Sequence, residues 1–313
     1  MARLTRRQAL AALGGGLLTA AGCADEDRRR RGGSITAAET PGPGVPLSFN
    51  VHPLGGRFVD LQFDALRRLK PPSIRVTLGL VTDTDAARAY IRAVPDPIGL
   101  VADFRLGPID PAGWPDLVEA TLRRYPTVRR AELLSEPDRQ NGLAPDRYVR
   151  EYLRPAYERV RERLPAVQVV AAAPGGDRKR TPDAFRRMTD AGADDFCDYR
   201  AVHVYFDDAG ALSAIGGSTG RPILVTETGT GSASQHVRWY TEVIPQIRAS
   251  LGTDQVFWYV LLESAALAGG SVKYGQLGFS VINSTSSASG QARGAPGSGL
   301  YSLITGLPLE PSV

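Results

Sequence analysis

Two glutamates in this sequence stand at the ends of short apolar runs, where a buried strand would give way to a turn. Glu136 lies in Ala131-Glu-Leu-Leu-Ser-Glu-Pro137, and Glu227 lies in Pro222-Ile-Leu-Val-Thr-Glu-Thr-Gly229. An ionised glutamate is rarely fully buried without a partner, so a carboxylate at such a point indicates an ion pair or chemistry. Two carboxylates that face each other across a cleft are the arrangement that cleavage of a glycosidic bond needs.

The elements that would position these residues are short β-like runs that alternate with longer amphipathic segments from Leu47 onward. Eight runs predict strands, at 47–52, 73–78, 98–104, 128–135, 167–173, 201–206, 222–227 and 255–262. Amphipathic segments that predict helices lie between them, among them 59–69, 114–125, 146–164, 182–191 and 234–251. Runs rich in Val, Ile and Leu without clean alternation are typical of a parallel sheet covered on both faces.

Strict β-then-α alternation with eight strands predicts a single-domain α/β fold, the (β/α)8 TIM barrel. A doubly wound open sheet is the alternative, but no glycine-rich phosphate-binding loop follows the first run. The stretch 280–298 is dense in Ser, Gly and Ala and predicts a long loop after the eighth strand. Residues 300–307 predict a closing helix.

Four of the runs carry short motifs in a fixed order. Arg124-Tyr-Pro126 and the segment ending in Glu136-Pro137 mark the fourth, and Val202-His-Val-Tyr205 marks the sixth. Val225-Thr-Glu-Thr-Gly229 marks the seventh and Val256-Phe-Trp-Tyr259 the eighth. In this order they resemble the clan A glycoside hydrolases, retaining (β/α)8 enzymes that include β-xylosidases, β-mannanases and endoglucanases.

The resemblance implies that Glu136 is the general acid/base and Glu227 the nucleophile. Their placement on strands 4 and 7 suits a separation of about 5–5.5 Å across the barrel mouth. The acid must hold its proton near neutral pH, so we expect burial and the second carboxylate to raise the pKa of Glu136.

The resemblance also implies a set of substrate-binding residues around the two carboxylates. Arg75 and the Tyr205 hydroxyl would keep the nucleophile ionised, and His203 would bind sugar hydroxyls or steady a catalytic side chain. Trp258 would offer a flat apolar face to a sugar ring. Glu132 has the same strand parity as Glu136, and we expect it deeper in the barrel, paired with an arginine as a structural residue.

The sequence departs from the clan pattern directly before the acid/base. The clan has Asn there, which typically binds the sugar 2-hydroxyl, whereas this chain has Ser135, and Leu134 replaces the preceding Trp. Serine is shorter and would reach that hydroxyl only through water or in a different pose. These changes favour an unusual substrate, or a barrel that binds glycans without cleaving them.

The first 46 residues predict an export signal followed by a flexible linker. A basic start and an apolar stretch at 9–21, too short to span a bilayer, suit an export signal over residues 1–23. Thr5-Arg-Arg-Gln-Ala-Leu10 resembles a twin-arginine signal. Ala20-Ala-Gly-Cys23 resembles a bacterial lipobox in which Cys23 is lipidated, although Ala20 replaces the usual Leu and cleavage without lipid is the alternative. Residues 24–46 predict a flexible linker before a catalytic domain at 47–313.

Composition excludes several other classes of function. The chain has a net charge of +4, but seven of its 37 basic and four of its 33 acidic residues precede residue 46, which leaves the remainder near neutral. A nucleic-acid binder would carry a clustered basic face. His52, His203 and His236 have no metal-ligand spacing, and Cys23 and Cys197 cannot complete a zinc site, so we expect no metal or cofactor. Cys197 is predicted to be a small core residue.

Two functions remain. The first is a retaining glycoside hydrolase that acts on β-linked glycans outside the cytoplasm, secreted or lipid-anchored to a bacterial cell envelope. The second is a catalytically silent barrel lipoprotein that binds cell-wall polysaccharide or a partner protein. A carboxyl separation well above about 6 Å would favour the binder. No sequence feature determines the oligomeric state or the sugar.

Overall fold

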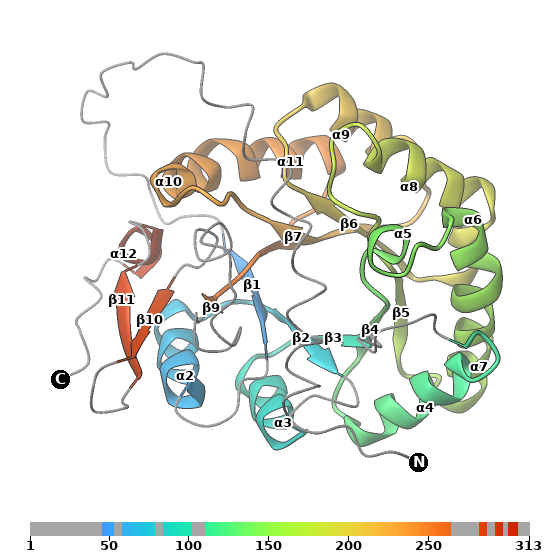
Figure 1. Cartoon of the computed structure of the whole chain (residues 1–313), viewed down its shortest axis with the longest axis horizontal. Coiled ribbons are helices and arrows are strands. Elements are labelled where there is room, and N and C mark those ends of the chain that lie inside the picture. Colours follow the sequence, from blue (N-terminus) through green and yellow to red (C-terminus); the bar gives the residue numbers. More distant parts are fainter. Residues whose placement is uncertain are drawn as a thin grey trace.

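Eight parallel strands close into a barrel in chain order (Figure 1). The computed structural model describes residues 46–52, 58–78, 84–101, 110–263, 282–286, 292–296 and 300–305. The strands are β1 (Ser48–Val51), β2 (Ile74–Leu78), β3 (Ile98–Val101), β4 (Arg130–Leu133), β5 (Gln168–Ala171), β6 (Tyr199–Val204), β7 (Ile223–Thr228) and β8 (Val256–Trp258). β8 pairs with β1 in parallel, which closes the ring. The predicted (β/α)8 barrel is confirmed.

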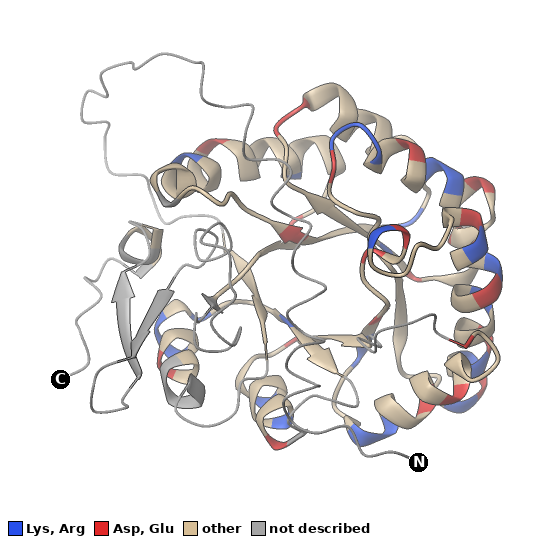
Figure 2. Ribbon diagram, in the orientation of Figure 1, with Lys and Arg blue, Asp and Glu red and all other residues tan. Residues whose placement is uncertain are grey.

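Helices surround the barrel, and their charged residues follow its outer ring (Figure 2). The longer ones are α2 (Phe58–Leu69), α3 (Thr84–Ala93), α4 (Trp114–Arg124), α7 (Arg154–Arg163), α8 (Thr181–Asp190), α9 (Ala209–Gly216) and α11 (Ile244–Leu251). The predicted helix at 146–164 is a run of α6 (Pro145–Tyr148), a π-helical turn at Val149–Leu153, and α7. The predicted helix at 234–251 is similarly α10 (His236–Arg238), a π-helical turn at Trp239–Val243, and α11.

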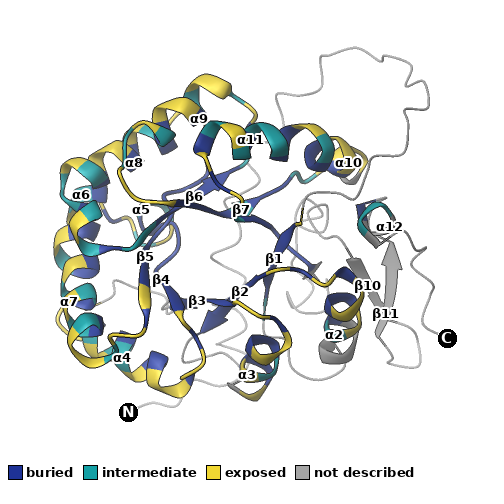
Figure 3. Ribbon diagram, turned by 180° about the vertical axis from the view of Figure 1, so that it is seen from behind, coloured by how far each residue is buried: buried dark blue, intermediate teal, exposed yellow. Residues whose placement is uncertain are grey.

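Sequence spacing explains why the helices lie on the sheet. In α8 the buried residues are Thr181, Ala184, Phe185 and Met188, a spacing of three and four that places them on one helix face. Figure 3 shows the resulting pattern, with buried strands inside and exposed outer faces on the helices. Burying an apolar side chain of this kind contributes about 1.5–3 kcal/mol.

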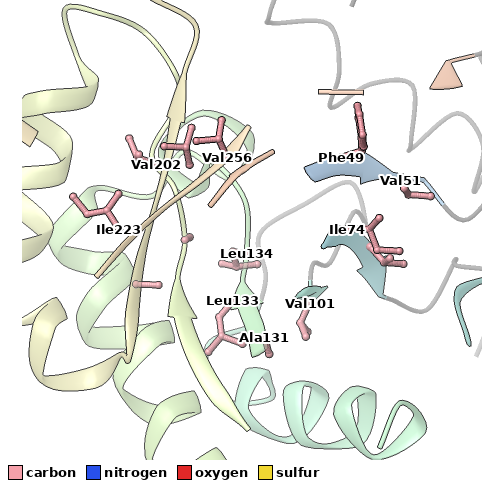
Figure 4. Close-up of a cluster of buried hydrophobic side chains, with 14 of the residues drawn as sticks. Phe49, Val51, Ile74, Val101, Ala131, Leu133, Leu134, Val202, Ile223 and Val256 are labelled. Carbon is pink, nitrogen blue, oxygen red and sulfur yellow. The ribbon is translucent and has the colours of Figure 1, made fainter. Parts of the chain in front are cut away.

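Two apolar layers result from the strands, one on each face of the sheet. The larger lies between strands and helices and includes Phe49, Val202 and Val256 (Figure 4). The smaller fills the barrel and consists of Ile98, Val170, Ala173, Ala201, Leu224 and Phe257, with Tyr199 packed against it. Cys197 lies in the outer layer with no exposed surface, as predicted, and burial raises the pKa of its thiol to about 12.

The C-terminal region differs from its prediction. The predicted eighth run divides into β8 and β9 (Leu262–Glu263), and β9 leaves the barrel to pair in parallel with β10 (Ile282–Ser286). β10 pairs antiparallel with β11 (Ala292–Pro296), so the expected long loop at 280–298 contains a strand pair. Hydrogen bonds between strands join main-chain groups, so they can form in a segment of any composition. The Ser-, Gly- and Ala-rich composition therefore suggested a loop and gave no sign of this pairing. The closing helix is confirmed as α12 (Leu300–Thr305).

The predicted export signal at 1–23, with the predicted lipidation site Cys23, lies outside the described residues, as does the predicted linker at 24–46 except for its last residue. Among the residues that the structure describes, no helix is long and apolar enough to cross a membrane.

A buried and an exposed valine should differ in how much stability the same substitution costs. Val202→Ala removes a fully buried side chain and should lower the free energy of unfolding by about 2 kcal/mol, through lost burial and a residual cavity. Val237→Ala makes the same change on a side chain that is 41% exposed and should cost less than about 0.5 kcal/mol. Urea unfolding of both variants measures the difference, and equal losses would contradict the described packing.

Candidate active site

Apart from Arg75, which lies near the start of β2, the residues predicted to do chemistry lie at or after the carboxyl ends of the barrel strands, the end that carries the active site in this fold. Asn50 of β1 pairs with Arg75 of β2, and His203 of β6 pairs with Glu227 of β7. Paired residues of neighbouring parallel strands point to the same side of the sheet. The contacts among these residues show that this side is the barrel interior.

Arg75 is the centre of the site. Its Nε and Nη2 donate to the two carboxylate oxygens of Glu132, at 2.6 and 3.1 Å. Its Nη1 donates to Glu227 Oε1 at 2.7 Å and to Asn50 Oδ1 at 2.9 Å. Burial opposes the charge of Arg75, but both glutamates raise the pKa of its guanidinium by a larger amount, so it stays cationic. Glu132 has no exposed surface, and its predicted pairing with an arginine is confirmed.

An extra residue in β7 aims Glu227 into the barrel. Val202 of β6 pairs with Val225, but the next residue, His203, pairs with Glu227, so Thr226 is the additional residue of a bulge. Strict alternation from the outward-facing Val225 would point Glu227 outward. The bulge reverses this parity, a use of bulges that is frequent beside active sites.

Both carboxylate oxygens of Glu227 accept hydrogen bonds. Oε1 accepts from Arg75, and Oε2 accepts from the Tyr205 hydroxyl at 2.7 Å. The side chain is 12% exposed, so it is held by the protein yet reachable from outside. Burial and the charge of Glu227 raise the pKa of Tyr205, which therefore remains a neutral donor. These are the contacts that the sequence predicted for the nucleophile.

Glu136 lies in a conformation that few non-glycine residues adopt. Its φ is 44°, in the left-handed region, and Leu134 two residues earlier has φ 72°. The Glu136 N–H donates to Ala173 O of the neighbouring β5 segment at 2.9 Å. The Arg139 guanidinium lies 4.0 Å from its carboxylate. A strained residue held by surrounding contacts is a recurrent feature of active sites.

His203 bridges the two carboxylates. Its Nδ1 lies 3.0 Å from Glu136 Oε1, and its Nε2 lies 3.4 Å from Glu227 Oε1. Burial lowers the pKa of His203, but the charges of both glutamates and the hydrogen bond to Glu136 raise it by more. His203 therefore contacts both of the side chains that were predicted to be catalytic.

The expected rise in the pKa of Glu136 is not found. Burial does raise the pKa of its carboxyl, but the hydrogen bond and charge of His203, the charge of Arg139 and a hydrogen bond from the Gly176 backbone lower it further. The net pKa is well below the usual value. The prediction considered the second carboxylate and omitted the imidazole between them. The lowered pKa of Glu136 and the raised pKa of His203 both favour a proton on the imidazole over one on the carboxyl.

The two carboxylates are close together. One oxygen of Glu136, one ring nitrogen of His203 and one oxygen of Glu227 all lie within 4.8 Å of one another. This separation is compatible with the spacing of about 5–5.5 Å in retaining glycosidases and is below the 6.5–9.5 Å of inverting ones. Three such ligands could also hold a metal ion, but Arg75 and Tyr205 already donate to both oxygens of Glu227.

Ser135 and Trp258 do not lie as expected. Ser135 Oγ accepts a hydrogen bond from Arg75 Nη2 at 3.2 Å, so it supports the arginine. Trp258 pairs with the outward-facing Phe49, has no exposed surface, and its ring lies edge-on to His236 of α10 at 4.9 Å. The expected sugar-binding face of Trp258 is therefore wrong, because its place in the strand register turns the indole to the outer layer.

Tyr259 takes the inward position that Trp258 lacks, and the sequence analysis missed it. It follows the inward Phe257 and outward Trp258 in alternation, and its N–H donates to Thr228 O at 2.7 Å. Its charge interaction with Tyr205 raises the pKa of that tyrosine, so the two phenols are neighbours. Alternation along β8 shows that Trp258 and Tyr259 face opposite ways, but only the pairing with β1 decides which is inside.

Several solved structures that match this chain at low sequence identity are glycoside hydrolases. A family 39 glycoside hydrolase from Bacteroides cellulosilyticus matches with TM-score 0.60 and 14% identity, over 84% of this chain and 64% of that one. A family 30 endoxylanase from Clostridium papyrosolvens matches with TM-score 0.54 and 10% identity, over 77% and 72%. The catalytic domain of a mannanase from a Streptomyces species matches with TM-score 0.52 and 12% identity, over 82% and 90%.

These similarities show the (β/α)8 fold of glycoside hydrolases, as the clan A resemblance implied. The chain spans 64% of the length of the family 39 structure. No protein-family model matches the sequence, and no curated protein matches it. The chemistry is therefore argued from the site.

Gly176 is predicted to be essential for the position of Tyr205. A Cβ on Gly176 would lie 2.5 Å from Tyr205 Cδ2 and 3.1 Å from His203 Cβ, so Gly176→Ala must displace the tyrosine ring. We expect the bond from Tyr205 to Glu227 to be lost and turnover of a cleaved glycoside to fall at least tenfold, with a smaller change in melting temperature. Gly220→Ala, where a Cβ meets nothing within 4 Å, is the control. Full turnover by Gly176→Ala would contradict the described packing.

The pair of His203 and Glu136 predicts a pH window for stability. The pKa of His203 is raised from 6.5. Its contribution to the free energy of unfolding is therefore fully present below pH 6.5 and is lost as the pH rises through its pKa in the folded protein. The pKa of Glu136 is lowered from 4.5, so its contribution is present above pH 4.5 and is lost on acidification. His203→Gln should therefore lower the free energy of unfolding most, by about 3 kcal/mol, between pH 4.5 and pH 6.5. Urea unfolding from pH 3 to 9 measures this, and a cost independent of pH would contradict it.

Proposed function

We propose that this protein is an exported retaining glycoside hydrolase that cleaves β-linked glycans by double displacement. Glu227 is the nucleophile and Glu136 the general acid/base. The observation that carries the proposal is the approach of the two carboxylates, whose oxygens lie within 4.8 Å with His203 between them. A spacing of this order lets one carboxylate attack the anomeric carbon while the other protonates the leaving oxygen.

In the first step a Glu227 oxygen attacks the anomeric carbon, and the bond from that carbon to the leaving oxygen breaks. Arg75 and Tyr205 hold the Glu227 carboxylate in one orientation, which supports attack from a fixed direction. Glu136 donates a proton to the leaving oxygen. The products are a glycosyl ester on Glu227 and the free alcohol of the leaving group.

The proton for this step comes from the pair of His203 and Glu136. Substrate entry expels water, and desolvation is the effect that raises the pKa of Glu136. The proton then moves from His203 Nδ1 to the Glu136 oxygen 3.0 Å away, and on to the leaving group. Once Glu227 is an ester it is no longer negative, which removes one of the charges that held the proton on His203.

In the second step water attacks the anomeric carbon and releases Glu227 as a carboxylate. Glu136, deprotonated in the first step, accepts the proton of that water, so the acid of one step is the base of the next. The cycle ends with the starting charges. The proposed mechanism therefore needs no metal or organic cofactor.

The substrate class is proposed from the resemblance and the neighbouring folds. The endoxylanase and mannanase among the similar structures suggest a polysaccharide or oligosaccharide of β-linked sugars. Tyr259 would provide the aromatic surface that the sequence analysis assigned to Trp258. In this proposal the Ser135 side chain does not bind the sugar 2-hydroxyl, because its Oγ accepts a hydrogen bond from Arg75.

Export is proposed from the leader alone. Thr5-Arg-Arg-Gln-Ala-Leu10 supports twin-arginine export, and Ala20-Ala-Gly-Cys23 supports lipid attachment at Cys23 to the cell envelope. The alternative function, a silent barrel lipoprotein that binds glycan or a partner protein, is favoured by one observation. The Asn expected before the acid/base is replaced by a serine that contacts the protein.

Substitution of the two glutamates separates these functions. With 4-nitrophenyl β-glycosides of glucose, xylose, mannose and galactose, Glu227→Gln should abolish release of nitrophenol because no nucleophile remains. Glu136→Ala should lower the rate about 10²–10⁴-fold, and azide should restore part of it by entering the vacated space. Glu158→Gln, a surface residue of α7 that is 56% exposed, is the matched control and should keep the full rate.

Two outcomes would contradict the proposal. Unchanged rates in both active-site variants would move the chemistry to other residues. Binding of a glycan by the wild-type protein without turnover of any glycoside would support the silent barrel.

A further inference from the structure

His52 is a half-buried residue with a buried ring nitrogen for which the mechanism above has no use. It directly follows β1, two residues after the inward-facing Asn50, so alternation directs it to the barrel mouth. Its ring lies edge-on to the ring of Tyr259, with the centroids 5.9 Å apart. Among the described residues, no atom forms a hydrogen bond with its buried Nε2.

A buried polar atom without a partner is uncommon in a folded protein and needs an explanation. The His52 carbonyl oxygen accepts a hydrogen bond from Gln62 of α2 at 3.3 Å, which helps to position the residue. Tyr259 fixes the face of the ring. The imidazole therefore packs against the protein, while its Nε2 makes no hydrogen bond to a described residue.

The charge state of His52 suits a neutral ligand. Burial lowers the pKa of His52 to about 4, the charge of Glu227 opposes this, and Arg75 adds to it. His52 is thus uncharged at neutral pH. A neutral imidazole can exchange one hydrogen bond with a hydroxyl through its free nitrogen.

The position of His52 assigns it to one side of the scissile bond. β1 and β8, which carry His52 and Tyr259, follow β7 around the closed barrel, whereas β4, which carries Glu136, lies across from β8. The charges of Glu227 and Arg75 both act on His52. The sugar that becomes attached to Glu227 would therefore contact this wall, and the leaving group would lie towards Glu136.

We propose that His52 and Tyr259 form a subsite for the sugar that Glu227 attacks, in which His52 Nε2 bonds one hydroxyl and Tyr259 packs against the ring. This inference rests on the proposed function and adds a specificity-determining residue to it. The ligand class is a neutral sugar ring with a free hydroxyl at one particular carbon.

The test uses the 4-nitrophenyl β-glycoside that the full-length protein cleaves fastest among glucose, xylose, mannose and galactose, together with its monodeoxy analogues. His52→Phe keeps the ring packing and removes the nitrogen. It should lower kcat/KM on the parent glycoside about tenfold, the usual range for loss of one hydrogen bond between neutral groups. On the one deoxy analogue that lacks the bonded hydroxyl, the kcat/KM values of wild type and His52→Phe should agree within about twofold.

Two further variants control for folding. His52→Asn keeps a polar group and should recover part of the preference for the parent glycoside over that analogue. His236→Phe changes another buried histidine that lies edge-on to an aromatic ring, but outside the barrel, and should keep the full preference whatever its melting temperature.

The outcomes separate this inference from the function on which it rests. If His52→Phe lowers kcat/KM equally on the parent and every analogue, or on none, the subsite is wrong while the hydrolase stands. If wild-type protein cleaves no glycoside in the panel, the proposed function fails and the subsite falls with it.

Discussion

The buried guanidinium of Arg75 is the constraint on which the arrangement of the candidate active site depends. An arginine that is 4% exposed can be accommodated only if its charge and donors are matched, and here residues from three other strands or their ends do so. The carboxylates of Glu132 and Glu227 neutralise its charge. The side-chain oxygens of Asn50 and Ser135 accept further hydrogen bonds from it. The same interactions that permit the cation therefore fix the proposed nucleophile. The replacement of the expected Asn by Ser135 belongs to this network, because the hydroxyl serves the arginine.

A second constraint is the surplus of negative charge that three glutamates create in one barrel. Arg75 compensates for part of it, and His203, which lies between Glu136 and Glu227, compensates further when it is protonated. The imidazole can bear a proton there because both neighbours favour it, despite complete burial. This charge balance favours a proton on the histidine over one on Glu136, the direction in which both pKa values are shifted. It also places the proton within one hydrogen bond of the group that is proposed to use it.

Much of the fold was predictable because it depends on local pattern. Eight apolar runs separated by amphipathic segments admit few topologies, since parallel strands need crossover helices and those helices must cover the sheet. The pairing of Glu132 with an arginine was also predictable, because a buried carboxylate requires an opposite charge; that the arginine is Arg75 was not. The C-terminal strand pair was not, because Ser-, Gly- and Ala-rich segments have weak side-chain preferences and their backbones pair according to what lies beside them.

By itself the sequence determined the order of the elements, the residue types at the strand ends and the presence of two glutamates that could act together. The tertiary structure decided which side of the sheet each side chain faces. The Thr226 bulge turns Glu227 inward, and the pairing of β8 with β1 turns Trp258 outward and Tyr259 inward. It also decided the pKa of Glu136, through an imidazole 67 positions away in the chain. Strand parity depends on register and pKa on neighbouring charges, and both are set by contacts between residues that are distant in sequence.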